Sequence, residues 1–161
     1  MLPADFESKM KRLLGSEFDA FLASYDRPLL PGLRQNPAKP APADALAPFG
    51  LAPILWAQNG FYYDPATRPG LSPLHEAGAY YLQEPSAMAP AGLLDAHPGE
   101  RVLDLCAAPG GKSTQLAAAM AGRGLLVCNE INPKRAKILA SNIERMGVAN
   151  ALVLNEHPAR L

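Results

Sequence analysis

The sequence predicts an α/β fold, the opening half of a doubly wound parallel sheet that follows a small α+β N-terminal region. Three observations support this prediction. Residues 99–161 alternate apolar strand-like runs with helical segments in the order strand, helix, strand, helix, strand, which favours parallel strands joined by right-handed crossovers. The glycine pair Gly110-Gly111 stands between the first strand and the first helix, and the acid Glu130 follows the second strand.

The N-terminal segment, residues 1–25, is predicted to be helical. Its apolar side chains recur every three or four residues, which indicates an amphipathic helix over residues 4–24 with an interruption near Gly15-Ser16. These side chains are Phe6, Met10, Leu13, Leu14, Phe18, Phe21 and Leu22.

Residues 26–98 form a second region, proline-rich at its start and α+β in character. Seven prolines between residues 26 and 53 predict an extended segment, either a linker or a lid. The runs Ile54-Leu55-Trp56 and Phe61-Tyr62-Tyr63 on either side of Gln58-Asn59-Gly60 predict a hairpin. We expect two short helices to follow. The hairpin strands and the helices are expected at residues 54–56, 61–63, 74–82 and 86–94.

Residues 99–161 are predicted to form three strands and two helices after a turn at Pro98-Gly99. Because parallel sheets are normally covered on both faces, three strands with two helices would leave one face open. We therefore expect an N-terminal piece of a longer protein, or a partner that completes the sheet. The strands are expected at residues 101–105, 125–129 and 151–154, and the helices at 112–121 and 134–146.

Composition limits the classes of function. The 15 acidic and 15 basic residues give a net charge of zero, so overall charge offers no argument for nucleic-acid binding. The two cysteines and three histidines show no metal-site spacing. No apolar run approaches the roughly 20 residues of a membrane span, and the N-terminus lacks a signal-peptide core. These features predict a cytoplasmic protein that is not bound to a membrane.

The loop after the first strand resembles the second half of a phosphate-binding P-loop. That motif, G-x-x-x-x-G-K-[ST], requires glycine at position 106, where this chain has Cys106. Pro109 removes a backbone N–H donor and fixes φ, which suits a polyphosphate cradle poorly. A nucleoside requires a tight turn at Gly110-Gly111 and a nearby acid for the ribose hydroxyls. Glu130, about twenty residues after the glycines, is that acid. The combination favours a nucleoside-type cofactor over ATP.

The string DLCAAPGGKST, residues 104–114, resembles motif I of the Sun (Fmu) family of RNA cytosine-C5 methyltransferases. HEAGAYYLQEPSAM, residues 75–88, is similar to the segment that precedes motif I in that family. The resemblance runs from about Phe49 to the end, and the N-terminal helix is similar to the bacterial ribosomal-RNA branch. It implies a Rossmann-like methyltransferase domain, S-adenosyl-L-methionine as cofactor, and RNA, in particular ribosomal RNA, as substrate and partner.

The resemblance also implies the cofactor residues. The loop would surround the methionine and ribose portions of the cofactor, and Glu130 would bind the ribose hydroxyls. His157 occupies the place near the adenine where the family usually has an aspartate, with Asn155 and Glu156 beside it. The loop residues are Cys106, Ala107, Ala108, Pro109, Gly110, Gly111 and Lys112.

Catalysis in the family is covalent, through a cysteine that attacks carbon 6 of cytosine and a second cysteine that helps to release the product. Those cysteines lie in Pro-Cys and Thr-Cys motifs, and neither motif occurs in these 161 residues. Cys106 belongs to the cofactor loop and is not a substitute. The resemblance therefore implies a full-length methyltransferase whose catalytic residues lie in a missing C-terminal half, and an inactive isolated chain.

Two other functions remain open at this point, a P-loop-like ATPase and a non-catalytic RNA-binding module. Cys128, within an apolar strand, is expected to be a small core residue. The basic run Lys134, Arg135 and Lys137 is expected to be a solvated helix face rather than an RNA contact.

Overall fold

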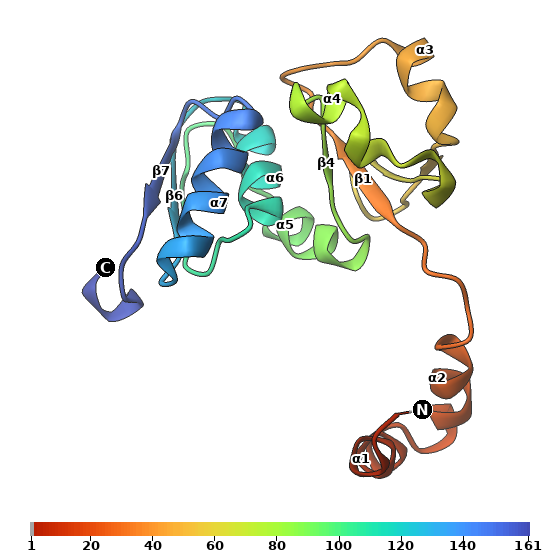
Figure 1. Ribbon diagram of the computed structural model, residues 1–161. Helices are drawn as coiled ribbons and strands as arrows, with labels where there is room; N and C mark the ends of the chain where they lie inside the picture. The colour runs from red at the N-terminus through yellow and green to blue at the C-terminus, as the bar shows by residue number, and fades with distance from the viewer. Residues whose placement is uncertain (1) are drawn as a thin grey trace.

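Two separate sheets organise the chain, and a pair of N-terminal helices stands apart from both (Figure 1). The computed structural model describes residues 2–161. One sheet has four antiparallel strands in the order β2-β3-β1-β4, and the other has three parallel strands in the order β5-β6-β7.

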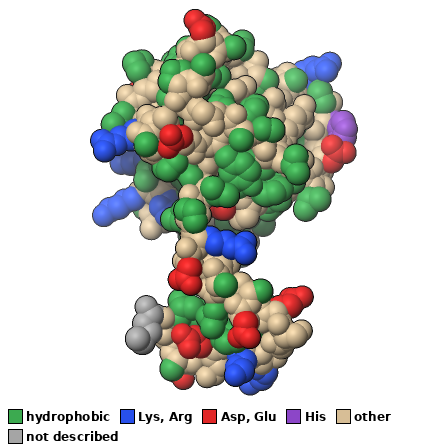
Figure 2. Space-filling view, turned by 90° about the vertical axis from the view of Figure 1, so that its right-hand side faces the viewer, with side chains coloured by type: hydrophobic (Ala, Val, Ile, Leu, Met, Phe, Trp, Pro, Cys, Tyr) green, Lys and Arg blue, Asp and Glu red, His purple; other side chains and the backbone are tan. Residues whose placement is uncertain are grey.

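The N-terminal helices confirm the predicted interruption. α1 (Ala4–Leu14) ends at Gly15, whose φ of 53° is in the left-handed region, and a 3₁₀ turn leads into α2 (Phe18–Ser24). Their apolar stripes meet in an aromatic cluster, in which the rings of Phe6 and Phe21 lie 6.2 Å apart and those of Phe21 and Tyr25 lie 5.3 Å apart. A short extended segment then connects these helices to the body of the molecule (Figures 1 and 2).

The antiparallel sheet has its own core on one face. The register places Leu33, Phe61 and Leu82 on that face, and Leu33 packs with the buried rings of Phe49 and Tyr80. The other face carries Arg34, Tyr81 and Gln83. The strands are β1 (Gly32–Gln35), β2 (Ala52–Pro53), β3 (Gly60–Tyr62) and β4 (Tyr80–Leu82), and the helices around them are α3 (Ala43–Leu46) and α4 (Pro73–Glu76). α5 (Ala89–Leu94) follows and packs against a helix of the parallel sheet, α6 (Gly111–Met120).

Two predictions for this region are wrong in part. Residues 74–82 do not form one helix, because α4 stops at Glu76 and Gly78 adopts a φ of 76°, after which the chain becomes β4. Pairing with β1 decides this outcome, which no local pattern revealed. The hairpin exists, but its first strand is β2, which consists of the two residues directly before the predicted run at 54–56. That run forms part of the connecting loop.

The parallel sheet follows the predicted order. β5 to β7 alternate with two helices, and the strand register is continuous from Leu103 through Val127 to Leu152. The elements are β5 (Arg101–Asp104), α6 (Gly111–Met120), β6 (Leu125–Asn129), α7 (Pro133–Arg145) and β7 (Ala151–Leu154).

The two faces of the parallel sheet differ in their cover. α6 and α7 both lie on one side (Figure 1), where Leu126, Cys128 and Leu139 are buried in the main core. On the opposite face Leu103 and Leu152 remain 52% and 53% exposed. The prediction of an open apolar face is confirmed. No helix within residues 2–161 is long and apolar enough to cross a membrane.

Polar contacts join the antiparallel sheet to the helices of the parallel sheet. Asn36 donates from Nδ2 to the carbonyls of Gly78 and Met146, each at 2.9 Å. Arg145, near the end of α7, donates to the His75 carbonyl at 2.6 Å, and its guanidinium lies 5.6 Å from the ring centre of Tyr81. The proline-rich stretch is therefore anchored at β1 and is not a free tether.

Candidate cofactor site

The loop after β5 is shaped by its glycines. Gly110 precedes the first turn of α6 with a φ of 113°, a conformation that side chains with a Cβ rarely adopt. The N–H groups of Gly111, Lys112 and Ser113 begin the helix, where intrahelical acceptors are lacking. This end of α6 is suited to an electronegative ligand group.

Gly111 also has a packing role that its sequence position did not suggest. A Cβ at Gly111 would lie 3.3 Å from Cδ of Gln83 and 3.4 Å from a ring carbon of Tyr81. The absent side chain therefore leaves room for the antiparallel sheet, whose residues Gln83 and Tyr81 pack against the loop.

Sequence reasoning missed Asp104, the last residue of β5. Ser113 donates from Oγ to Oδ2 of Asp104 at 2.8 Å, which fixes this carboxylate beside the first turn of α6. Its position directly before the glycine loop, at the carboxyl end of a parallel strand, was the available signal.

Glu130 is buried at the carboxyl end of β6, with 3% of its surface exposed. Its Oε1 accepts from the Asn132 N–H at 2.9 Å, and Nη1 of Arg135 lies 3.4 Å from Oε2. Arg135 also donates from Nη2 to the Ala108 carbonyl at 2.7 Å. Arg135 thus links the acid to the glycine loop, whereas its position in a basic run had indicated a solvated face.

His157 lies beyond β7 with an exposed side chain, and its Nδ1 accepts from the Ala159 N–H at 3.2 Å. Asn155, two residues earlier, contacts the main chain of Glu130, because Nδ2 of Asn155 donates to the Glu130 carbonyl at 2.7 Å. The structure therefore brings the loop and Glu130 together, and attaches the end of β7 to them through Asn155.

A cavity of about 210 Å³ lies between the loop and the segment after β4. Tyr81, Gln83 and Glu84 line one side, and the residues from Cys106 to Lys112 supply most of the other, together with Asp104. Hydrogen bonds from Ser86 hold the pKa of Glu84 below its ordinary value, so this rim carries a carboxylate. Burial raises the pKa of Tyr81, which therefore stays a neutral phenol at neutral pH.

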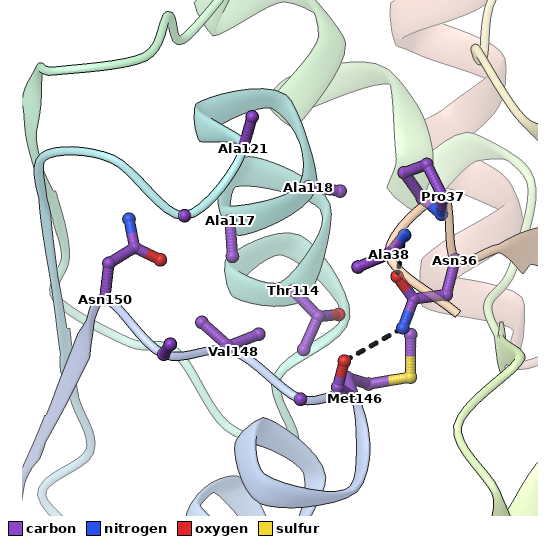
Figure 3. Close-up of a pocket in the computed structure, with 13 residues that line it drawn as sticks. Asn36, Pro37, Ala38, Thr114, Ala117, Ala118, Ala121, Met146, Val148 and Asn150 are labelled. Carbon is purple, nitrogen blue, oxygen red and sulfur yellow. Dashed lines mark hydrogen bonds between the residues drawn. The ribbon is translucent and has the colours of Figure 1, made fainter. Parts of the chain in front are cut away.

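A second hollow, of about 360 Å³, lies at the other end of α6 (Figure 3). Small side chains such as Ala117 and Ala121 form much of its wall, and the Nδ2 group of Asn36 is already bonded to the Met146 carbonyl. Its thirteen lining residues all lie within residues 2–161, and none of them is charged. It offers no chemistry comparable to that of the loop.

The cysteines occupy contrasting places. Cys128 is fully buried in β6, as expected, and burial raises the pKa of its thiol to about 11. Cys106 is exposed at the cavity. Within residues 2–161, no group of three His, Cys, Asp or Glu side chains is placed to hold a metal ion.

Comparisons with known proteins show the family of the chain. Residues 2–85 match the model of the N-terminal domain of 16S rRNA methyltransferase RsmF, and residues 91–160 match that of 16S rRNA methyltransferase RsmB/F. The chain is 40% identical to ribosomal RNA small subunit methyltransferase F of Salmonella paratyphi B over 92% of its own length and 34% of that protein, and to that of Salmonella newport to the same extent. It thus spans about a third of these relatives.

Solved structures share the fold. A crystal structure of a methyltransferase homologue from Pyrococcus horikoshii matches 96% of the chain and 57% of that protein, with a TM-score of 0.79 and 27% identity. The two family models and the Salmonella relatives confirm the resemblance to the bacterial ribosomal-RNA branch. The chain belongs to the RsmF family of 16S rRNA methyltransferases.

Proposed function

We propose that the loop from Cys106 to Lys112, together with Glu130, binds S-adenosyl-L-methionine. The observation that carries the proposal is the buried carboxylate of Glu130, which Arg135 ties to the carbonyl of Ala108 in the loop. A carboxylate at the end of the second strand can accept hydrogen bonds from both hydroxyls of a ribose. The residues present therefore fit the group.

The remaining residues have distinct parts in this proposal. The N–H groups at the start of α6 and the ammonium of Lys112 would face the carboxylate of the methionine portion, and Asp104 its amino group. His157 would lie toward the adenine. When bound, the cofactor supplies an electrophilic methyl group. The cavity bordered by Tyr81 and Gln83 leaves room for the methyl end of the cofactor.

ATP fits the same residues less well. Pro109 has no N–H to offer, and Cys106 stands where a P-loop has glycine. The charge of Glu130 would also repel a nearby polyphosphate. These features favour the methyltransferase over the ATPase alternative.

The substrate and the reaction are those of a longer protein. We infer methylation of cytosine carbon 5 in ribosomal RNA in the cytoplasm. The names of the relatives support a ribosomal RNA methyltransferase, and the resemblance of the motif in residues 104–114 supports cytosine carbon 5. The nucleophilic cysteine would lie outside these 161 residues. More of the same protein would cover the open face at Leu103 and Leu152, whose exposure is unusual for a parallel sheet.

Calorimetry with S-adenosylhomocysteine and with ATP tests the proposal. We expect S-adenosylhomocysteine to bind and Glu130→Gln to weaken it by roughly 10- to 100-fold, because hydrogen bonds to a charged group are worth about 1.5–3 kcal/mol. Glu144→Gln, on an exposed part of α7, is the matched control and should leave affinity unchanged. Tighter binding of ATP, or an unchanged affinity in Glu130→Gln, would refute the assignment.

A further inference from the structure

Arg34 is a buried cation without an ionic partner. Its side chain lies on β1 with 2% of the residue exposed, and among residues 2–161 no carboxylate forms a salt bridge with it. Burial lowers the pKa of its guanidinium to about 10, so it remains charged at neutral pH. A buried, unpaired charge is costly, and the neutral acceptors around it must hold it in place.

Two of those acceptors belong to the start of α6. Nη2 of Arg34 donates to Oγ1 of Thr114 at 2.8 Å and to the Gly111 carbonyl at 3.2 Å. The Thr114 hydroxyl in turn donates to the Gly110 carbonyl at 2.8 Å. A guanidinium on the antiparallel sheet is therefore connected, through one hydroxyl, to the glycine peptide that opens the helix.

The same guanidinium also holds Gln83. Nε of Arg34 donates to Oε1 of Gln83 at 3.2 Å, and Nε2 of Gln83 donates to the Ala87 carbonyl at 3.1 Å. Gln83 is the side chain that fills the space beside Gly111 and lines the cavity. Arg34 thus fixes two opposite walls of the cavity, the loop and the segment after β4.

We propose that Arg34 is a positioning residue of the cofactor site, which sets the Gly110-Gly111 peptide and the first-turn N–H groups of α6 through the Thr114 hydroxyl. The proposal rests on the proposed function of that loop. A preformed loop lowers the ordering cost of binding, so the effect of Arg34 should appear in cofactor affinity although it does not touch the cofactor.

The test uses three single variants and one double variant in the full-length protein. Arg34→Met keeps the length of the side chain but removes its donors, and Thr114→Val breaks the same connection from the other side. Leu33→Ala is the matched control, because Leu33 is the preceding residue of β1 and is buried in the core of the opposite face. Affinity for S-adenosylhomocysteine, thermal stability and amide hydrogen exchange at residues 111–113 are measured for each.

We expect Arg34→Met and Thr114→Val each to weaken binding about tenfold, because a loop that is no longer preformed must be ordered when the ligand binds. Both should speed exchange of the amides of residues 111–113. The double variant should bind no more weakly than the more affected of the two single variants, because both substitutions break the same connection from Arg34 through Thr114 to Gly110. Leu33→Ala should lower thermal stability and leave affinity and these amides unchanged. Thr114→Val decides the matter if Arg34→Met fails to fold.

The proposal is overturned if Leu33→Ala reproduces both changes, or if Thr114→Val leaves both at their original values. Failure of the proposed function gives a different result. In that case the unmodified protein does not bind S-adenosylhomocysteine, while exchange at residues 111–113 still responds to Arg34→Met and not to Leu33→Ala.

Discussion

The two sheets of this chain are stabilised in different ways. Both faces of the antiparallel sheet are covered, one by its own core around Leu33 and the other by α6, to which Arg34 is bonded. The parallel sheet has one face packed under α6 and α7, and one that leaves Leu103 and Leu152 half exposed. The proposed cofactor site lies where the face of the antiparallel sheet that carries Arg34 meets α6 of the parallel sheet, so its geometry depends on both sheets.

Gly78→Ala should have the largest effect on stability, because the added methyl group would push the antiparallel sheet away from α7 of the parallel sheet. A Cβ at Gly78 would lie 2.0 Å from the Arg145 carbonyl oxygen, and its φ of 76° is already unfavourable for alanine. We expect a loss of about 3 kcal/mol or more in unfolding free energy, measured by urea denaturation.

Gly122→Ala is the control for backbone strain. Gly122 has a φ of 72°, and no atom lies within 4 Å of the position that a Cβ would occupy, so the expected loss is about 1 kcal/mol. Equal losses of unfolding free energy in the two variants would show that the close contact between Gly78 and the Arg145 carbonyl contributes nothing to the effect of Gly78→Ala.

A second pair of variants compares the two faces of the parallel sheet. Leu139→Ala, under α7, should cost about 2–5 kcal/mol in unfolding free energy, because Leu139 is fully buried. Leu152→Lys, on the open face, should change it by about 0.5 kcal/mol or less in this 161-residue chain. In the full-length protein, Leu152→Lys should become destabilising if further chain covers that face. Equal costs in the isolated chain would contradict the description of the two faces.

The sequence could predict the parallel sheet well and the antiparallel sheet poorly, for a physical reason. Local periodicity and glycines indicate the strands and helices of residues 99–161, and the spacing from Gly111 to Glu130 follows from the crossover. Tyr80–Leu82 became a strand through pairing with β1, which lies some fifty residues earlier. Arg34 and Arg135 acquire their roles through contacts with the loop, and neither contact has a local signal.

The last comparison concerns the two thiols. The pKa of Cys128 is about 11 in the folded protein and near its ordinary value of about 9 in the unfolded chain, so the unfolded state releases the proton first. The contribution of Cys128 to stability is therefore complete below pH 9 and is lost as the pH rises toward 11. We expect the unfolding free energy to fall more steeply over this range in the unmodified protein than in Cys128→Ala.

Alkylation by iodoacetamide provides the companion measurement. The exposed Cys106 should react in the folded protein, and Cys128 should react after unfolding. Saturating S-adenosylhomocysteine should slow the reaction of Cys106. Rapid alkylation of Cys128 in the folded state would contradict its burial in β6.

A crystal structure with bound S-adenosylhomocysteine would locate the ribose relative to Glu130. We expect both ribose hydroxyls within hydrogen-bonding distance of the Glu130 carboxylate, about 2.5–2.7 Å for such charge-assisted bonds, and the amino-acid portion beside the N–H groups that open α6. A ligand bound elsewhere, or one whose ribose lies away from Glu130, would contradict the proposed site.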